Sequence, residues 1–148
     1  EISCLRTDAK RLDVLDMFEF SPFQPKEKAL REMEKCHAFI HLRRRIEIGN
    51  VDSQGSPLKM LDYHNVGRPV IASDIQSYQY IRESNFGLLV DPSSVSSVVS
   101  AIWKLRENWG VWEQMGQRAN QFVCNERSWD QTANSVENVL EEASRFLK

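Results

Sequence analysis

A polar segment ahead of a short apolar run carries the residues best suited to bind an anion. Ser56 and Pro57 are typical of a helix start, because the serine can accept a bond from a free N–H and proline at the first helical position needs none. Lys59 and Asp62 follow in the first turns of that helix. A lysine so close to a helix N-terminus opposes the usual preference for acids, and a bound anion would explain it, although an exposed lysine is tolerated anywhere.

Three adjacent arginines, Arg43, Arg44 and Arg45, follow a predicted strand over residues 38–42. Ligands of α/β sheets bind at the carboxyl ends of the strands, which is where these arginines would lie. Their guanidinium groups repel one another unless water or an anion neutralises them. The sequence leaves open a solvated loop, contact with an anionic ligand, and contact with an acidic neighbouring domain.

Strands and helices alternate along the chain, which predicts an α/β fold with a parallel sheet covered by helices on both faces. Gly67 and Pro69 end the helix that begins at Pro57, and the unbroken apolar run 70–72 predicts a buried parallel strand. Other strands are predicted over residues 14–20, 38–42 and 87–90, with a further one over residues 2–5.

Apolar periodicity predicts the helices. Helices are expected from Pro25, over residues 77–83, and from Ser128 to the end of the chain. Two more have apolar faces formed by Val95, Val98, Val99, Ile102 and Leu105, and by Trp112, Met115, Ala119 and Phe122.

Composition is that of one soluble domain. The chain has 148 residues, of which 41% are hydrophobic and 27% charged, and a net charge of -2 gives no reason to expect nucleic acid as a partner. Three cysteines, Cys4, Cys36 and Cys124, form no C-x-x-C pair and are interpreted as reduced, mostly packed thiols. No membrane span or signal peptide is visible, so we expect a cytoplasmic protein, at most peripheral to a membrane.

Several kinds of active site are disfavoured by the motifs that the sequence lacks. His37, His41 and His64 have no metal-ligand spacing, so each is interpreted as a core or surface histidine and no metal site is predicted. There is no G-x-S-x-G elbow of a hydrolase. Absence of G-x-G-x-x-G and of a Walker A loop argues against a dehydrogenase and an NTPase.

A series of short motifs resembles the C-terminal nucleotide-sugar-binding domain of retaining GT-B-type glycosyltransferases (group 1, family 4). The pattern Glu-x7-Glu followed by Ala-Met-Ala-x-Gly-x-Pro-Val is matched in its second half by residues 62–70. The resemblance continues through residues 71–74, 85–92 (Asn-Phe-Gly-Leu-Leu-Val-Asp-Pro) and 115–119 (Met-Gly-Gln-Arg-Ala). It covers most of the chain from about Phe20 onward.

This resemblance implies an α/β, Rossmann-like fold and a donor-binding role for specific residues. Asp62 stands at the second acid, which in the family bonds the ribose hydroxyls, and Gln54 stands at the first, which contacts the donor sugar. The backbone N–H groups of Ser56 and Leu58, with Lys59, would hold the donor phosphates. By their place at the strand end, and not by the resemblance, the arginines 43–45 are candidates for contact with the donor diphosphate or an anionic acceptor. Such enzymes need no metal or other cofactor, and no catalytic base can be named.

Two departures from the family pattern leave a second function open. Asp62 is one methylene shorter than glutamate, and Gln54 carries no charge. The first hypothesis is the donor-binding domain of a hexosyltransferase that uses a UDP-, GDP- or ADP-linked sugar. The alternative is a degenerate, non-catalytic nucleotide-sugar-binding or scaffold subunit that partners an active transferase.

We expect residues 1–148 to form a single domain, the C-terminal part of a longer enzyme. The acceptor domain, which would bind a glycan or lipid, would lie upstream, and the isolated chain is expected to be inactive. Along the final helix an apolar stripe recurs at steps of four and three, formed by Trp129, Ala133, Val136, Leu140, Ala143 and Leu147. The far end of this stripe is expected to be frayed or covered by a neighbouring copy, unless the whole stripe packs on the domain's own sheet.

Overall fold

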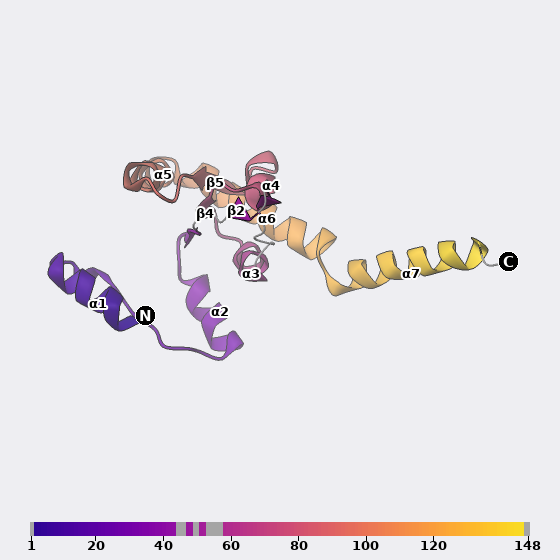
Figure 1. Ribbon diagram of the computed structural model, residues 1–148, viewed down its shortest axis with the longest axis horizontal. Coiled ribbons are helices and arrows are strands. Elements are labelled where there is room, and N and C mark those ends of the chain that lie inside the picture. Colours follow the sequence, from indigo (N-terminus) through magenta and orange to yellow (C-terminus); the bar gives the residue numbers. More distant parts are fainter. Residues whose placement is uncertain (1, 44–46, 49–50, 53–57, 147–148) are drawn as a thin grey trace. The chain divides into compact units, whose positions relative to one another are not determined.

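The computed structural model describes residues 2–43, 47–48, 51–52 and 58–146, and Figure 1 labels the elements. Contacts divide the chain into two compact units, residues 1–31 and 32–148. The first unit contains α1 (Ile2–Arg11) and a 3₁₀ turn (Leu15–Met17), and α2 (Lys26–Glu34) begins within it. The helix predicted from Pro25 is thereby confirmed.

Both strands predicted near the N-terminus are wrong. Residues 2–5 belong to α1, whose apolar residues Ile2, Leu5 and Ala9 have helical spacing, and Ala9 is buried. The apolar run 14–20 contains the 3₁₀ turn and becomes extended only at Phe18. A strand is held by a neighbour along its edge, and in the part of the chain that the structure describes no strand pairs with this run.

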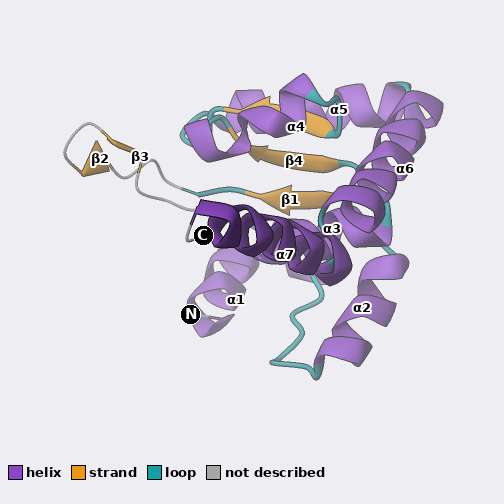
Figure 2. Ribbon diagram, turned by 90° about the vertical axis from the view of Figure 1, so that its right-hand side faces the viewer, coloured by secondary structure: helices purple, strands orange, loops and turns teal. Residues whose placement is uncertain are grey.

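Three parallel strands form the sheet of the second unit, in the order β1 (Phe39–His41), β4 (Val70–Ser73), β5 (Gly87–Val90). Figure 2 shows β1 and β4 side by side with their arrowheads at the same end. The strands predicted over 38–42, 70–72 and 87–90 are confirmed. The middle strand β4 is buried along its whole length, as its uninterrupted apolar sequence predicts.

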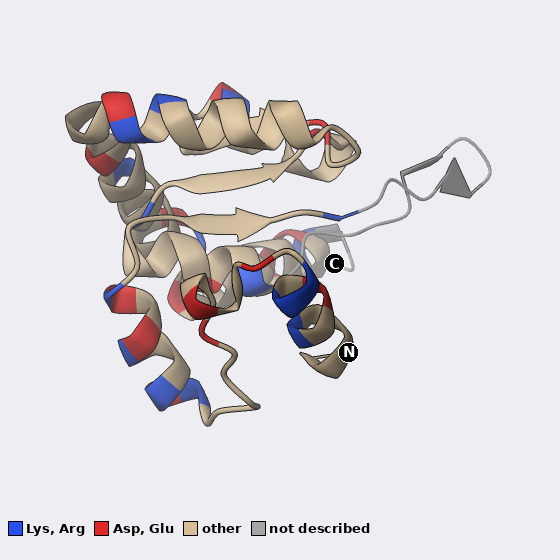
Figure 3. Cartoon of the chain, turned by 90° about the vertical axis from the view of Figure 1, so that its left-hand side faces the viewer, with Lys and Arg blue, Asp and Glu red and all other residues tan. Residues whose placement is uncertain are grey.

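Alternate residues of β4 face two separate hydrophobic clusters. Val70 and Ala72 pack with residues of α3 (Leu58–Val66), α4 (Gln79–Glu83) and α6 (Trp109–Glu126), chiefly Met60, Ile81 and Ala119. Ile71 packs instead with Ala101, Leu105, Trp112 and Met115 of α5 (Val95–Glu107) and α6. Helices therefore cover both faces of the sheet, which confirms the predicted α/β, Rossmann-like fold class. The three strands carry no charged residue, and the charges gather on the helices (Figure 3).

The predicted apolar face of α5 is only partly correct. Val95, Val99 and Ile102 are exposed, whereas Val98, Ala101 and Leu105 pack toward the sheet. The sequence offers two overlapping apolar stripes on this helix, and only contact with the sheet selects one. On α6 the expected face is confirmed, since Trp112, Met115 and Ala119 are buried and Phe122 packs beside them.

A two-stranded antiparallel ribbon, β2 (Glu47–Ile48) with β3 (Val51–Asp52), was not predicted. A 3₁₀ turn (Gln76–Tyr78) precedes α4, so the helix predicted over 77–83 is confirmed in two parts. All three cysteines have exposed side chains, which corrects the expectation that they are mostly packed. No helix among the described residues is long and apolar enough to cross a membrane.

The final helix, α7 (Trp129–Phe146), begins as predicted. The Ser128 hydroxyl accepts a hydrogen bond from the backbone N–H of Gln131 at 3.2 Å, and Asp130 lies in the first turn. Residues 129–145 are exposed, including Val136 and Leu140 of the apolar stripe. The alternative that this stripe packs on the domain's own sheet is therefore wrong for the described residues, which do not include Leu147.

Candidate functional site

Polar residues follow each strand at the carboxyl edge of the sheet. Because β1, β4 and β5 are parallel, their carboxyl ends share this edge. Arg43 follows β1 by two residues, Asp74 follows β4 directly, and Asp91 follows β5 directly. The edge thus has a cationic side at β1 and an anionic side at β4 and β5.

The backbone of Arg43 is held by Ser73, the last residue of β4. The Arg43 N–H donates to Ser73 Oγ at 2.6 Å, and the same hydroxyl donates to the Arg43 carbonyl at 2.9 Å. Arg43 Nη1 lies 3.5 Å from the hydroxyl of Tyr78, at the long end of the hydrogen-bond range. Ser73 and Tyr78 are both fully buried. The predicted residue Arg43 is therefore fixed at this edge by two residues that the sequence did not indicate.

His41, the last residue of β1, lies between two tyrosine rings. Its ring centroid is 6.0 Å from that of Tyr63 and 5.9 Å from that of Tyr78, both in edge contact. Burial, with the positive charges of Arg43 and Lys59, lowers the pKa of His41 below its ordinary value, which favours the neutral imidazole. Its Nε2 is buried without a hydrogen-bond partner in the described part of the chain.

Residues of α3 complete the cationic side. Met60 is fully buried in the core and sets the rotation of the helix, which leaves Lys59 exposed in the first turn and Asp62 half-buried one turn later. Lys59 and Arg43 both lie close enough to His41 for their charges to affect its pKa. Tyr63 stacks on Phe39 of β1 at 4.5 Å between ring centroids, which ties α3 to the strand beneath it.

The structure thus brings together Arg43, Lys59 and His41, with Asp62 on the same helix as Lys59. Leu58 is exposed at the start of α3. The predicted residues Gln54, Ser56, Arg44 and Arg45 lie outside the described residues. His41 was interpreted from the sequence as a core or surface histidine. Its place at the end of an apolar run, two residues before the arginines, is the signal that could have indicated a site.

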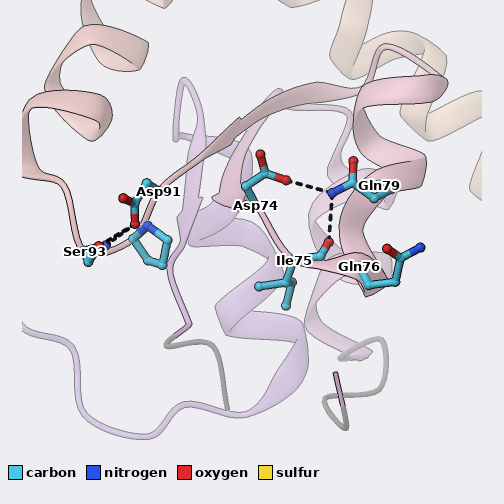
Figure 4. Close-up of a pocket in the computed structure, with 7 residues that line it drawn as sticks. Asp74, Ile75, Gln76, Gln79, Asp91 and Ser93 are labelled. Carbon is cyan, nitrogen blue, oxygen red and sulfur yellow. Dashed lines mark hydrogen bonds between the residues drawn. The ribbon is translucent and has the colours of Figure 1, made fainter. Parts of the chain in front are cut away.

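A depression of about 1060 Å³ lies on the anionic side, beyond β4 and β5, lined by Asp74, Ile75, Gln76, Gln79, Asp91, Pro92 and Ser93 (Figure 4). Asp74 accepts hydrogen bonds from Arg82 at 2.6 Å and Gln79 at 2.7 Å. Burial would raise the pKa of Asp74, but these two bonds and the positive charge of Arg82 together outweigh burial and lower that pKa. Within the described residues no group of three or more His, Cys, Asp or Glu could hold a metal ion.

Comparison with known families shows to which family the chain belongs. Residues 2–122 match the family described as "Glycosyl transferases group 1". The chain belongs to this family. The match includes β1 and α3, the elements that carry the cationic side of the sheet edge. It begins well before Phe20, where the resemblance was expected to start.

Among solved structures, the chain is similar to sucrose-phosphate synthase from Thermosynechococcus elongatus. The TM-score is 0.76 and the sequence identity 15%, over 95% of this chain and 34% of that chain. At this identity the likeness shows the fold alone, and the chain spans about a third of the length of that protein. No curated protein sequence matches the chain significantly.

Proposed function

We propose that this chain is the donor-binding part of a retaining glycosyltransferase that uses a nucleoside-diphosphate hexose. The observation that supports the proposal best is the cationic side of the sheet edge in a member of this family. There the charges of Arg43 and Lys59 both act on His41, and Asp62 lies one helical turn beyond Lys59. Cations beside a carboxylate fit the two polar parts of a nucleoside diphosphate, its phosphates and its ribose.

Each residue has a chemical role in this proposal. The Asp62 carboxylate accepts hydrogen bonds from the ribose hydroxyls. The guanidinium of Arg43 and the ammonium of Lys59 face the diphosphate and stabilise the negative charge that develops as it leaves. The N–H of Leu58 adds a donor, because the first N–H groups of a helix have no intrahelical partner. These groups would neutralise the leaving group without a metal ion.

The sugar acceptor, a glycan or lipid, would approach from a further domain of the intact protein. The uncharged Gln54 at the position of the first acid favours one alternative, a non-catalytic subunit that binds the donor beside an active transferase. Transfer activity in the intact protein distinguishes the two, because the alternative predicts donor binding without turnover.

The test is titration of the chain with UDP, GDP and ADP. We expect Asp62→Ala to weaken binding of the preferred nucleotide by about 1.5–3 kcal/mol, the range for a hydrogen bond to a charged group. Asp91→Asn is the matched control, because it removes an exposed carboxylate from the anionic side of the same edge. An Asp62→Ala affinity within about twofold of the wild type, with unchanged thermal unfolding, would contradict the assignment of Asp62.

A further inference from the structure

The hydroxyl of Ser73 replaces a missing step of the sheet ladder. The pairing of β1 with β4 ends at His41, which lies opposite Ala72. Beyond this point the chain stays bonded to β5, since the Asp74 N–H donates to the carbonyl of Val90 at 2.8 Å. The carbonyl of Ser73 is also occupied, because it accepts from the N–H of Ile75 at 2.9 Å. The backbone of Arg43 is bonded instead to the side chain of Ser73.

The side chain of Ser73 supplies both missing bonds. Its Oγ accepts from the Arg43 N–H at 2.6 Å and donates to the Arg43 carbonyl at 2.9 Å, so one hydroxyl satisfies both backbone groups of one residue. The hydroxyl is fully buried, and replacement by a methyl group would leave both backbone groups without these bonds. This arrangement fixes the chain two residues past β1, where it would otherwise leave the sheet.

The backbone bridge determines where the Arg43 side chain begins, and Tyr78 limits where it goes. Tyr78 is fully buried, and its hydroxyl lies 3.5 Å from Arg43 Nη1. Two groups from the β4 side thus restrict a side chain from the β1 side. An arginine with a fixed backbone loses less conformational entropy when it binds an anion, and preorganisation of this kind increases affinity.

We propose that Ser73 is a positioning residue of the nucleotide site, which acts through Arg43 by holding the guanidinium in place for the donor diphosphate. This inference rests on the proposed function. It requires the effect of Ser73 on binding to depend on the Arg43 side chain. If the role of Ser73 were merely structural, the effects of substituting Ser73 and Arg43 on nucleotide binding would be independent of each other.

The experiment measures binding of UDP, GDP and ADP to the full 148-residue chain by calorimetry. The variants are Ser73→Ala, Arg43→Gln and the double variant, and the most tightly bound nucleotide is used throughout. We expect Ser73→Ala to weaken binding about three- to tenfold and to make it less sensitive to salt. In the Arg43→Gln background the same change should have no further effect. Ser77→Ala is the control, because Ser77 Oγ is also buried but has no hydrogen-bond partner in the described part of the chain.

Two results would overturn the inference alone. The first is unchanged nucleotide affinity in Ser73→Ala, and the second is an equal loss with and without the Arg43 side chain. If Ser73→Ala does not fold, Ser73→Cys, which is close to serine in size and only a weak hydrogen-bond donor, is measured against the same expectations. A wild-type chain that binds none of the three nucleotides would overturn the proposed function as well, so the two failures are distinguishable.

Discussion

A close approach of two helices at Gly116 gives the sharpest prediction for stability. α6 crosses the turn that ends α3, where Gly67 has a φ of +74° and its N–H donates to the His64 carbonyl at 2.9 Å. A Cβ atom at Gly116 would lie 2.3 Å from the Gly67 carbonyl oxygen and 2.9 Å from Arg68 Cα. Both neighbours are backbone atoms, which cannot rotate away as a side chain could. Gly116→Ala must therefore separate α6 from the end of α3.

Two opposing effects decide the size of the change. Overpacking costs typically about 1–3 kcal/mol, and contact with backbone at 2.3 Å favours the upper part of that range. Alanine stabilises a helix interior by about 1 kcal/mol relative to glycine. We therefore expect Gly116→Ala to lower the free energy of unfolding by about 1–2 kcal/mol.

Gly110→Ala is the matched control on the same helix. A Cβ at Gly110 would meet no heavy atom within 4 Å apart from its chain neighbours and its own helix backbone, so helix propensity alone should act. Because Gly110 is the second residue of α6, we expect a stabilisation of at most about 0.5–1 kcal/mol, the value for a helix interior. Urea unfolding followed by circular dichroism measures both variants. If Gly116→Ala were as stabilising as Gly110→Ala, the close approach of α6 to the α3 turn would be refuted.

Two further predictions concern a buried histidine and an exposed helix. Burial lowers the pKa of His64 from 6.5 to about 4. As the pH falls, His64 is therefore protonated in the unfolded chain before it is protonated in the folded one. The free energy of unfolding should fall by up to about 3 kcal/mol as the pH drops from 6.5 to 4. Urea unfolding at a series of pH values measures this dependence, and we expect His64→Gln to reduce it. A pH dependence of stability that the substitution leaves unchanged would contradict the prediction. The exposed apolar stripe of α7 should cause the chain to self-associate, and Leu140→Glu should abolish this association. Sedimentation velocity over a concentration series measures it. A wild-type chain that stays monomeric would contradict the prediction.

The sequence alone was sufficient for elements whose signals are local. Gly67 and Pro69 predict the end of α3, because a left-handed stop and a residue without an N–H act within one turn. The uninterrupted apolar run of β4 predicts a strand buried on both faces. The motif at Asp62 indicated the family that the comparison confirms. Such features need no knowledge of distant residues.

Tertiary structure decided everything that depends on a partner far away in the chain. The run 14–20 has strand-like composition, but a strand requires a neighbour along its edge and the described chain provides none. The hydrogen bonds between Ser73 and Arg43 join residues that are 30 positions apart in the sequence. His41 likewise lies between two tyrosines only because α3 and the segment after β4 pack against the sheet. A site of this kind forms where strand ends converge, and the order and register of strands are properties of the folded chain.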